Sequence, residues 1–176
     1  MRTVPIVLFD GVQSLDVTGP LEVFAGANRW QSGREPARSA YRIRTAGLGG
    51  RQVRTSSGLH LAPDQDLTDV APTDVLIVPG GEGTRRADPD LVAWLRVHGP
   101  RAERLVSVCT GAFLLAEAGL LDRRRVTTHW APAHLSWPPP ACSRAAALRR
   151  TGWPWASSNG TARFPWPSGW CSTAST

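Results

Sequence analysis

A cysteine between an apolar strand-like run and an apolar helix-like run is the residue of this chain best suited to chemistry. The run 105–108 leads into Cys109, and Gly111 then begins a segment whose apolar residues recur at helical spacing. This order predicts a nucleophile elbow, a sharp strand-to-helix turn that presents one side chain above the helix N-terminus. Unpaired N–H groups at that terminus favour a thiolate, so we expect a lowered pKa for Cys109. The alternative is a buried cysteine that serves only as a small apolar side chain.

Asp16 is the candidate acid beside Cys109. A cysteine that attacks an electrophilic carbon needs a neighbouring group that carries the proton. Asp16 follows the apolar run 4–9, which we expect to be a buried strand. Its alternative role is to cap the helix that we expect to open at Gly19-Pro20, and Thr18 competes for that role.

Main-chain groups are the candidates for holding a ligand. The N–H groups of Gly81 and Thr110 are predicted to form an oxyanion site, because the pair Gly80-Gly81 lets the main chain approach a ligand closely. Gly111 adds backbone at the elbow itself. His129, in a Thr-Thr-His-Trp segment, is a further candidate for the site, with packing of the domain as its alternative role.

The elements that must position these residues alternate between strands and helices. Short apolar strands separated by helices predict an α/β domain with a parallel sheet and helices on both faces. Ligands of such folds bind at the carboxyl ends of the strands, where loops 10–18, 80–84 and 109–111 should meet. The expected strands are 4–9, 41–46, 75–78 and 105–108, with a small ribbon from 52–54 and 59–62 and further helices at 88–97 and 111–118.

Several other classes of protein are disfavoured by the sequence. His129 and His134 lie five residues apart, off one helix face, and nothing completes a metal set, so no metal is expected. The turn 80–83 lacks the Lys of a P-loop and any GxGxxG pattern, so no nucleotide cofactor is expected. Three cysteines do not suggest a disulfide framework. Without a signal-like segment or a membrane-length apolar run, we expect a cytoplasmic protein with no membrane partner.

The basic charge is confined to the last third of the chain. Residues 1–122 carry 13 Arg and 14 acidic residues, whereas 123–176 carry 7 Arg and no acidic residue. From about residue 136, runs of Pro and Trp replace any helical or strand period, so no folded basic face and no direct nucleic-acid binding are expected. The chain has Arg but no Lys, which suggests GC-rich codons. We hypothesise that 136–176 are read in a shifted frame and have no defined fold; a Pro/Trp-rich docking segment is the alternative.

Several stretches, taken together, resemble the ThiJ/PfpI group of the class I glutamine amidotransferase-like superfamily. The resemblance spans about residues 4–135 and implies a flavodoxin-like three-layer α/β sandwich that is incomplete at its C-terminal end. The matching stretches are 9–24, 53–58, 76–81, 107–113, and 118–122 with 127–130.

Two subfamilies share this pattern, and they imply different functions. Stretches 9–13, 26–28 and 111–122 look closer to the N-terminal effector domains of GlxA-like AraC-family regulators. That similarity implies a domain that binds a small-molecule effector and forms a homodimer, here without the C-terminal helix-turn-helix region. The alternative subfamily is isonitrile hydratase, a lyase that adds water to isocyanides. A non-functional remnant is the third possibility.

The resemblance also implies roles for the candidate catalytic residues. By similarity to the hydratase, Asp16 hydrogen-bonds Cys109 and relays protons, with Thr110 beside it. Cysteine proteases of the wider family carry a histidine directly after the nucleophile. Thr110 occupies that position here, so proteolysis is disfavoured.

Overall fold

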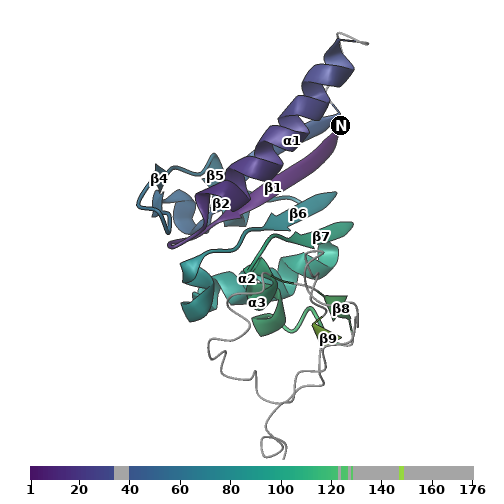
Figure 1. The fold of residues 1–176 in the computed structure, drawn as a ribbon. Coiled ribbons are helices and arrows are strands. Elements are labelled where there is room, and N and C mark those ends of the chain that lie inside the picture. The colour runs from purple at the N-terminus through teal and green to yellow at the C-terminus, as the bar shows by residue number, and fades with distance from the viewer. Residues whose placement is uncertain (34–39, 123, 127, 129–146, 149–176) are drawn as a thin grey trace, which may run out of the picture.

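A five-stranded parallel sheet forms the centre of the protein (Figure 1). The computed structural model describes residues 1–33, 40–122, 124–126, 128 and 147–148. The strand order is β5-β2-β1-β6-β7, and each neighbouring pair is parallel. The strands are β1 (Arg2–Leu8), β2 (Tyr41–Gly47), β5 (Gln65–Asp66), β6 (Val75–Val78) and β7 (Arg104–Ser107).

The middle strands are the continuous apolar runs of the sequence. All four residues of β6 are buried, as are the last five residues of β1. Strands buried on both faces of a parallel sheet carry apolar side chains throughout rather than at alternate positions. The strands expected from the sequence are therefore confirmed. β5 was not expected, because its Gln and Asp carry no strand signal.

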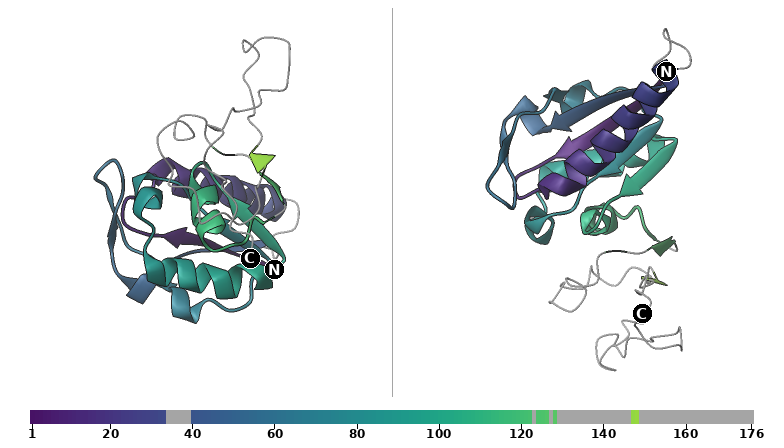
Figure 2. Two further views of the ribbon diagram at one scale, coloured as in Figure 1. Left: turned by 90° about the horizontal axis from the view of Figure 1, so that it is seen from below. Right: turned by 45° about the horizontal axis from the view of Figure 1, so that its top comes forward.

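Helices cover both faces of this sheet. α1 (Ser14–Ser32) lies across β1 and β2 (Figure 1), and α2 (Pro89–His98) lies on the opposite side of the sheet (Figure 2). α3 (Gly111–Glu117) packs beside α2, where the Arg96 guanidinium donates to the Glu117 carbonyl oxygen. The predicted α/β architecture, with helices on both faces, is confirmed.

The start of α1 differs from the prediction. We expected the helix to open at Gly19-Pro20, but it begins at Ser14 and contains Pro20. Asp16 lies in its first turn, and the N-cap residue Gln13 makes no side-chain capping bond. The Thr18 hydroxyl donates to the Ser14 carbonyl inside the helix, so neither Asp16 nor Thr18 is the N-cap. Contacts from elsewhere in the fold, described below, hold this first turn.

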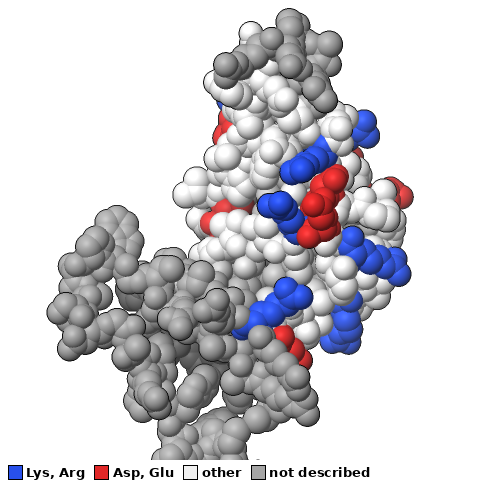
Figure 3. Space-filling view, turned by 90° about the vertical axis from the view of Figure 1, so that its right-hand side faces the viewer, with Lys and Arg blue, Asp and Glu red and all other residues white. Residues whose placement is uncertain are grey.

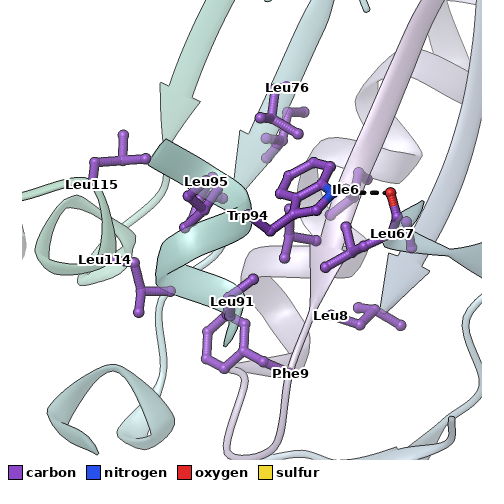
Figure 4. Packing of buried hydrophobic residues seen from close by; sticks show 14 of the residues in the cluster. Ile6, Leu8, Phe9, Leu67, Leu76, Leu91, Trp94, Leu95, Leu114 and Leu115 are labelled. Carbon is purple, nitrogen blue, oxygen red and sulfur yellow. Dashed lines mark hydrogen bonds between the residues drawn. The ribbon is translucent and has the colours of Figure 1, made fainter. Parts of the chain in front are cut away.

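The core between α2 and the sheet is a cluster of leucine, isoleucine and aromatic side chains (Figure 4). The indole N–H of Trp94 donates to the Leu67 carbonyl oxygen at 3.0 Å, which satisfies a buried polar group. Asp88 caps α2 by accepting from the Asp90 N–H at 2.9 Å, with Pro89 in the first turn as expected. α2 is therefore fixed against the sheet and carries the chain from β6 to β7.

Smaller elements complete the described part of the chain. β3 (Val53–Arg54) and β4 (His60–Leu61) form the predicted antiparallel ribbon. β8 (Arg125–Val126) pairs with β9 (Ala147–Leu148). Apart from β9, the predictions for 136–176 fall outside the described residues. The four 3-10 turns are Leu48–Gly50, Leu67–Asp69, Glu82–Arg86 and Gly99–Arg101.

One face of the described part of the molecule carries charges of both signs (Figure 3). On the face drawn in Figure 3, basic and acidic side chains are interspersed. Over the described ranges, no helix combines the length and the apolar character that crossing a bilayer requires.

Candidate active site

Cys109 occupies a strained turn between β7 and α3. Its φ of 51° makes it the one residue other than glycine with a positive φ in the described part of the chain. The Gly111 N–H donates to the Val108 carbonyl at 2.9 Å and closes the turn. A Cβ at Gly111 would overlap the Val78 carbonyl and lie 2.7 Å from the Pro79 carbonyl oxygen. The turn therefore requires glycine two residues after the cysteine, and the predicted nucleophile elbow is confirmed.

Asp16 and Thr110 converge beside this turn. The Gly80 N–H donates to Asp16 Oδ2 at 3.0 Å, which ties the first turn of α1 to the end of β6. A Cβ at Gly80 would lie 2.6 Å from Thr110 N and Oγ1 and 2.9 Å from Asp16 Oδ2. These distances place Asp16, Thr110 and the main chain of Gly80 at one point, adjacent to Cys109.

The main chain of Gly81 is already engaged in the site. Its N–H donates to Thr110 Oγ1 at 2.9 Å. This N–H therefore donates to a side-chain hydroxyl in the arrangement seen here, and its contact with a ligand stays a prediction. Gly81 has a φ of 140°, and a Cβ there would overlap the Gly11 carbonyl and lie 2.5 Å from Gln13 N. Glycine is required at this position by backbone approach and not only by ligand access.

The pKa of Cys109 is raised above its ordinary value of 9.0, contrary to the expectation of a thiolate. Burial contributes most, and the negative charge of the Asp16 carboxylate adds to it. The N–H and the hydroxyl of Thr110 act in the opposite direction and are outweighed. α3 has only seven residues, so few aligned peptides stand behind those donors. At neutral pH the raised pKa keeps Cys109 as a thiol beside Asp16.

The three loops that were expected to meet do so. Val12 pairs with Gly81 in an antiparallel bridge, and the Gln13 N–H donates to the Gly80 carbonyl at 2.7 Å. Ser56 joins the β3–β4 ribbon to both loops: its hydroxyl donates to the Gly11 carbonyl at 2.6 Å and accepts from the Glu82 N–H at 3.1 Å. Ser56 was missed as a site residue, although its Ser-Ser-Gly turn was visible in the sequence.

Thr128 was also missed. Its hydroxyl donates to the Cys109 carbonyl oxygen at 2.6 Å. The signal was the Thr-Thr-His-Trp segment, in which the histidine had attracted attention instead. His129 itself lies outside the described residues. Within the described ranges, no three His, Cys, Asp or Glu side chains gather as a metal site would require.

Comparisons with known proteins assign this arrangement to a family. The model of the DJ-1/PfpI family matches residues 2–135. The chain is 41% identical over 129 residues to an uncharacterized protein in the cpoL 5' region of Streptomyces lividans, covering 72% of this chain and 86% of that protein. It is 35% identical over 130 residues to the HTH-type transcriptional regulator GbdR of Pseudomonas aeruginosa, covering 73% of this chain and 34% of the regulator. It is 35% identical over 127 residues to isonitrile hydratase of Pseudomonas putida, covering 71% and 51%.

Solved structures agree with the fold. An AraC family transcriptional regulator from Pseudomonas putida superposes with a TM-score of 0.64 at 22% identity, covering 76% of this chain and 70% of that one. A ThiJ/PfpI family protein from Pseudomonas syringae gives 0.62 at 26% identity, covering 73% and 50%. The chain spans about a third of the length of GbdR and about half that of the hydratase. With its parallel sheet, its elbow cysteine and a match over residues 2–135, the chain belongs to the DJ-1/PfpI family.

Proposed function

We propose that this chain is the effector-sensing domain of a GlxA-type AraC-family transcriptional regulator. The observation that carries the proposal is the hydrogen bond from the Gly80 N–H to Asp16 Oδ2, which joins the elbow site to α1. Asp16 lies beside the Cys109 thiol and in the first turn of a 19-residue helix. A small molecule that binds at Cys109 and Asp16 therefore acts on a long surface element. Similarity to HTH-type regulators supports the same function.

The proposed effector site is formed by Cys109, Asp16 and Thr110, with the main chain of Gly80, Gly81 and Gly111 around them. His129 is proposed as a further member. Thr110 is buried and Cys109 is half-buried, so only part of this cluster is open to a ligand. Because the Asp16 carboxylate is an acceptor, we expect the effector to present a hydrogen-bond donor.

Thermal denaturation in the presence of a small-molecule panel tests the proposal. The panel contains amino acids, amides and carboxylic acids, and the readout is the shift in Tm. At least one compound should raise the Tm of the wild-type chain and of Glu22→Gln, a control with an exposed carboxylate on the same helix. Asp16→Asn should lose that shift. A panel that stabilises Asp16→Asn as well as the wild type contradicts the proposed site.

Isonitrile hydration is the second candidate function, favoured by the thiol–carboxylate pair. The Cys109 sulfur would add to the terminal carbon of an isocyanide R–NC, and its proton would pass through Asp16 to the same carbon, giving R–N=CH–S–Cys. Water would then add to that carbon. Release of the protonated thiol leaves the formamide R–NH–CHO. The net reaction consumes one isocyanide and one water.

Cyclohexyl isocyanide is the probe that distinguishes the two functions. Formamide is followed by proton NMR. Under the sensor proposal, the purified chain forms no more of it than the Cys109→Ala variant does. Formamide production that requires both Cys109 and Asp16, and that survives in Glu22→Gln, would establish the enzyme instead.

We also propose that the domain forms a homodimer and does not itself bind nucleic acid. Three large apolar side chains of α1 are exposed, Leu15 at 68%, Val23 at 70% and Trp30 at 68%. Apolar side chains gathered on one helix are typical of contact surfaces. Sedimentation equilibrium should give a dimer for the wild type and a monomer for Val23→Glu. A wild-type monomer at micromolar concentration contradicts the proposal.

A further inference from the structure

The peptide unit between Cys109 and Thr110 has a hydrogen-bond partner on each side. Its carbonyl oxygen accepts from the Thr128 hydroxyl at 2.6 Å. Its N–H, which belongs to Thr110, acts on the Cys109 sulfur as a donor and so lowers the pKa of that thiol. A peptide unit is planar, so its C=O and N–H cannot turn independently. Whatever fixes the carbonyl also fixes the direction of the N–H that faces the sulfur.

We propose that Thr128 is a positioning residue for Cys109. The Thr128 hydroxyl holds the Cys109–Thr110 peptide so that the Thr110 N–H stays directed at the sulfur. The proposal rests on Cys109 being the reacting or ligand-binding atom of the function proposed above. A hydrogen bond to the carbonyl also polarises the peptide, which makes its N–H a stronger donor to a thiolate.

The conformation of the elbow explains why an external hydrogen bond is needed. The positive φ of Cys109 is strained for a residue that carries a Cβ. Within the turn, two hydrogen bonds join neighbouring peptides: the Gly111 N–H donates to Val108, and the Phe113 N–H donates to Thr110. The Cys109 carbonyl, by contrast, accepts its hydrogen bond from Thr128, a residue outside the turn. This bond is partly buried, so water competes with it poorly.

The pH dependence of Cys109 alkylation by iodoacetamide tests the proposal. Modification of the Cys109 peptide is followed by mass spectrometry, so the other two cysteines do not interfere. Loss of the hydroxyl in Thr128→Val should move the rise of the alkylation rate to higher pH and slow the reaction at pH 8 severalfold. Thr128→Ser, which keeps the hydroxyl, should restore the wild-type profile.

Thr73→Val is the matched structural control. Thr73 is buried, and its hydroxyl donates to the Thr3 carbonyl at 3.0 Å, away from the elbow. This variant should lose thermal stability and keep the wild-type pH profile. An unchanged profile in Thr128→Val, or an equal shift in Thr73→Val, overturns the proposal. Thr128→Ala provides the same comparison if the valine variant lacks a cooperative thermal transition. The alkylation assay uses neither effector nor isocyanide. Its result can therefore be interpreted even if the proposed function is wrong.

Discussion

Burial and the Asp16 carboxylate keep the proton on Cys109, while the N–H and hydroxyl of Thr110 act against them. The nucleophile and its elbow could be predicted from the sequence, because a strand, a cysteine and a glycine are close together in the chain. The state of the thiol could not be predicted. It depends on Asp16, which is distant in sequence and reaches the elbow only through the fold.

Asp16→Asn should lower the pKa of Cys109, because it removes the negative charge that opposes the thiolate. Alkylation of Cys109 by iodoacetamide at pH 7.5 should then become severalfold faster. Glu22→Gln removes an exposed carboxylate from the same helix and should leave the rate unchanged. Slower alkylation in Asp16→Asn would mean that its bond to the Gly80 N–H matters more than its charge.

The raised pKa of Cys109 also predicts how stability depends on pH. Unfolding returns the thiol to its ordinary pKa of 9.0, so the folded state retains the proton more strongly above that pH. The stabilisation is complete below pH 9.0 and is lost as the pH rises through the folded-state pKa. Urea unfolding should therefore show that the wild type loses stability relative to Cys109→Ala as the pH rises above 9.0. A constant difference between the two proteins contradicts this expectation.

At the scale of elements, those that depend on local sequence signals could be predicted, and those that depend on long-range contacts could not. The buried strands and α2 could be predicted, because apolar runs and the Asp88-Pro89 start act locally. The start of α1 could not, because proline suggested an opening at Gly19-Pro20. The chain instead enters the helix at Ser14, where the Gln13 N–H and the Asp16 carboxylate both bond to Gly80. Tertiary hydrogen bonds thus outweigh the cost of a proline inside the helix.

Two glycine-to-alanine substitutions should have opposite effects. Gly80→Ala puts a Cβ 2.6 Å from Thr110 N and should destabilise the fold by roughly 1–3 kcal/mol. It should also separate Asp16 from Thr110. Gly26→Ala meets only the flexible end of the Arg29 side chain, at 3.8 Å, inside α1 and should stabilise by about 0.5–1 kcal/mol. Urea unfolding of both variants measures these changes. A stabilised Gly80→Ala would show that the site tolerates a larger opening than its packing suggests.

For the whole molecule, the sequence divides into a patterned part and a part without pattern. The match to the family model ends at residue 135, close to the point where helical and strand periods stop. Within the patterned part, the alternation of strands and helices was enough to predict a parallel sheet and the meeting of three loops at the carboxyl ends of its strands. The contacts of Ser56 and Thr128 could not be predicted, because a single hydroxyl carries no periodic signal and both partners are main-chain carbonyls.

The coding DNA tests the hypothesis of a shifted frame after residue 136. We expect one alternative frame to restore alternating strand and helix patterns and then to encode two helix-turn-helix motifs. The measurement is the nucleotide sequence of the gene and about 600 bases downstream, a length that two such motifs with their linker require. If neither alternative frame restores the pattern, the Pro- and Trp-rich reading of 136–176 stands as the intended one.

The hydrogen bond from Thr128 has a consequence in the reverse direction. Equilibrium coupling between two sites is reciprocal. If the Thr128 hydroxyl stabilises a thiolate at Cys109 by a given free energy, deprotonation of Cys109 strengthens the hydrogen bond from Thr128 by the same free energy. An effector or adduct that moves the sulfur away from the Thr110 N–H would weaken the hydrogen bond from Thr128 by the same free energy. Chemistry at the elbow would thus be transmitted to Thr128, by a route separate from α1.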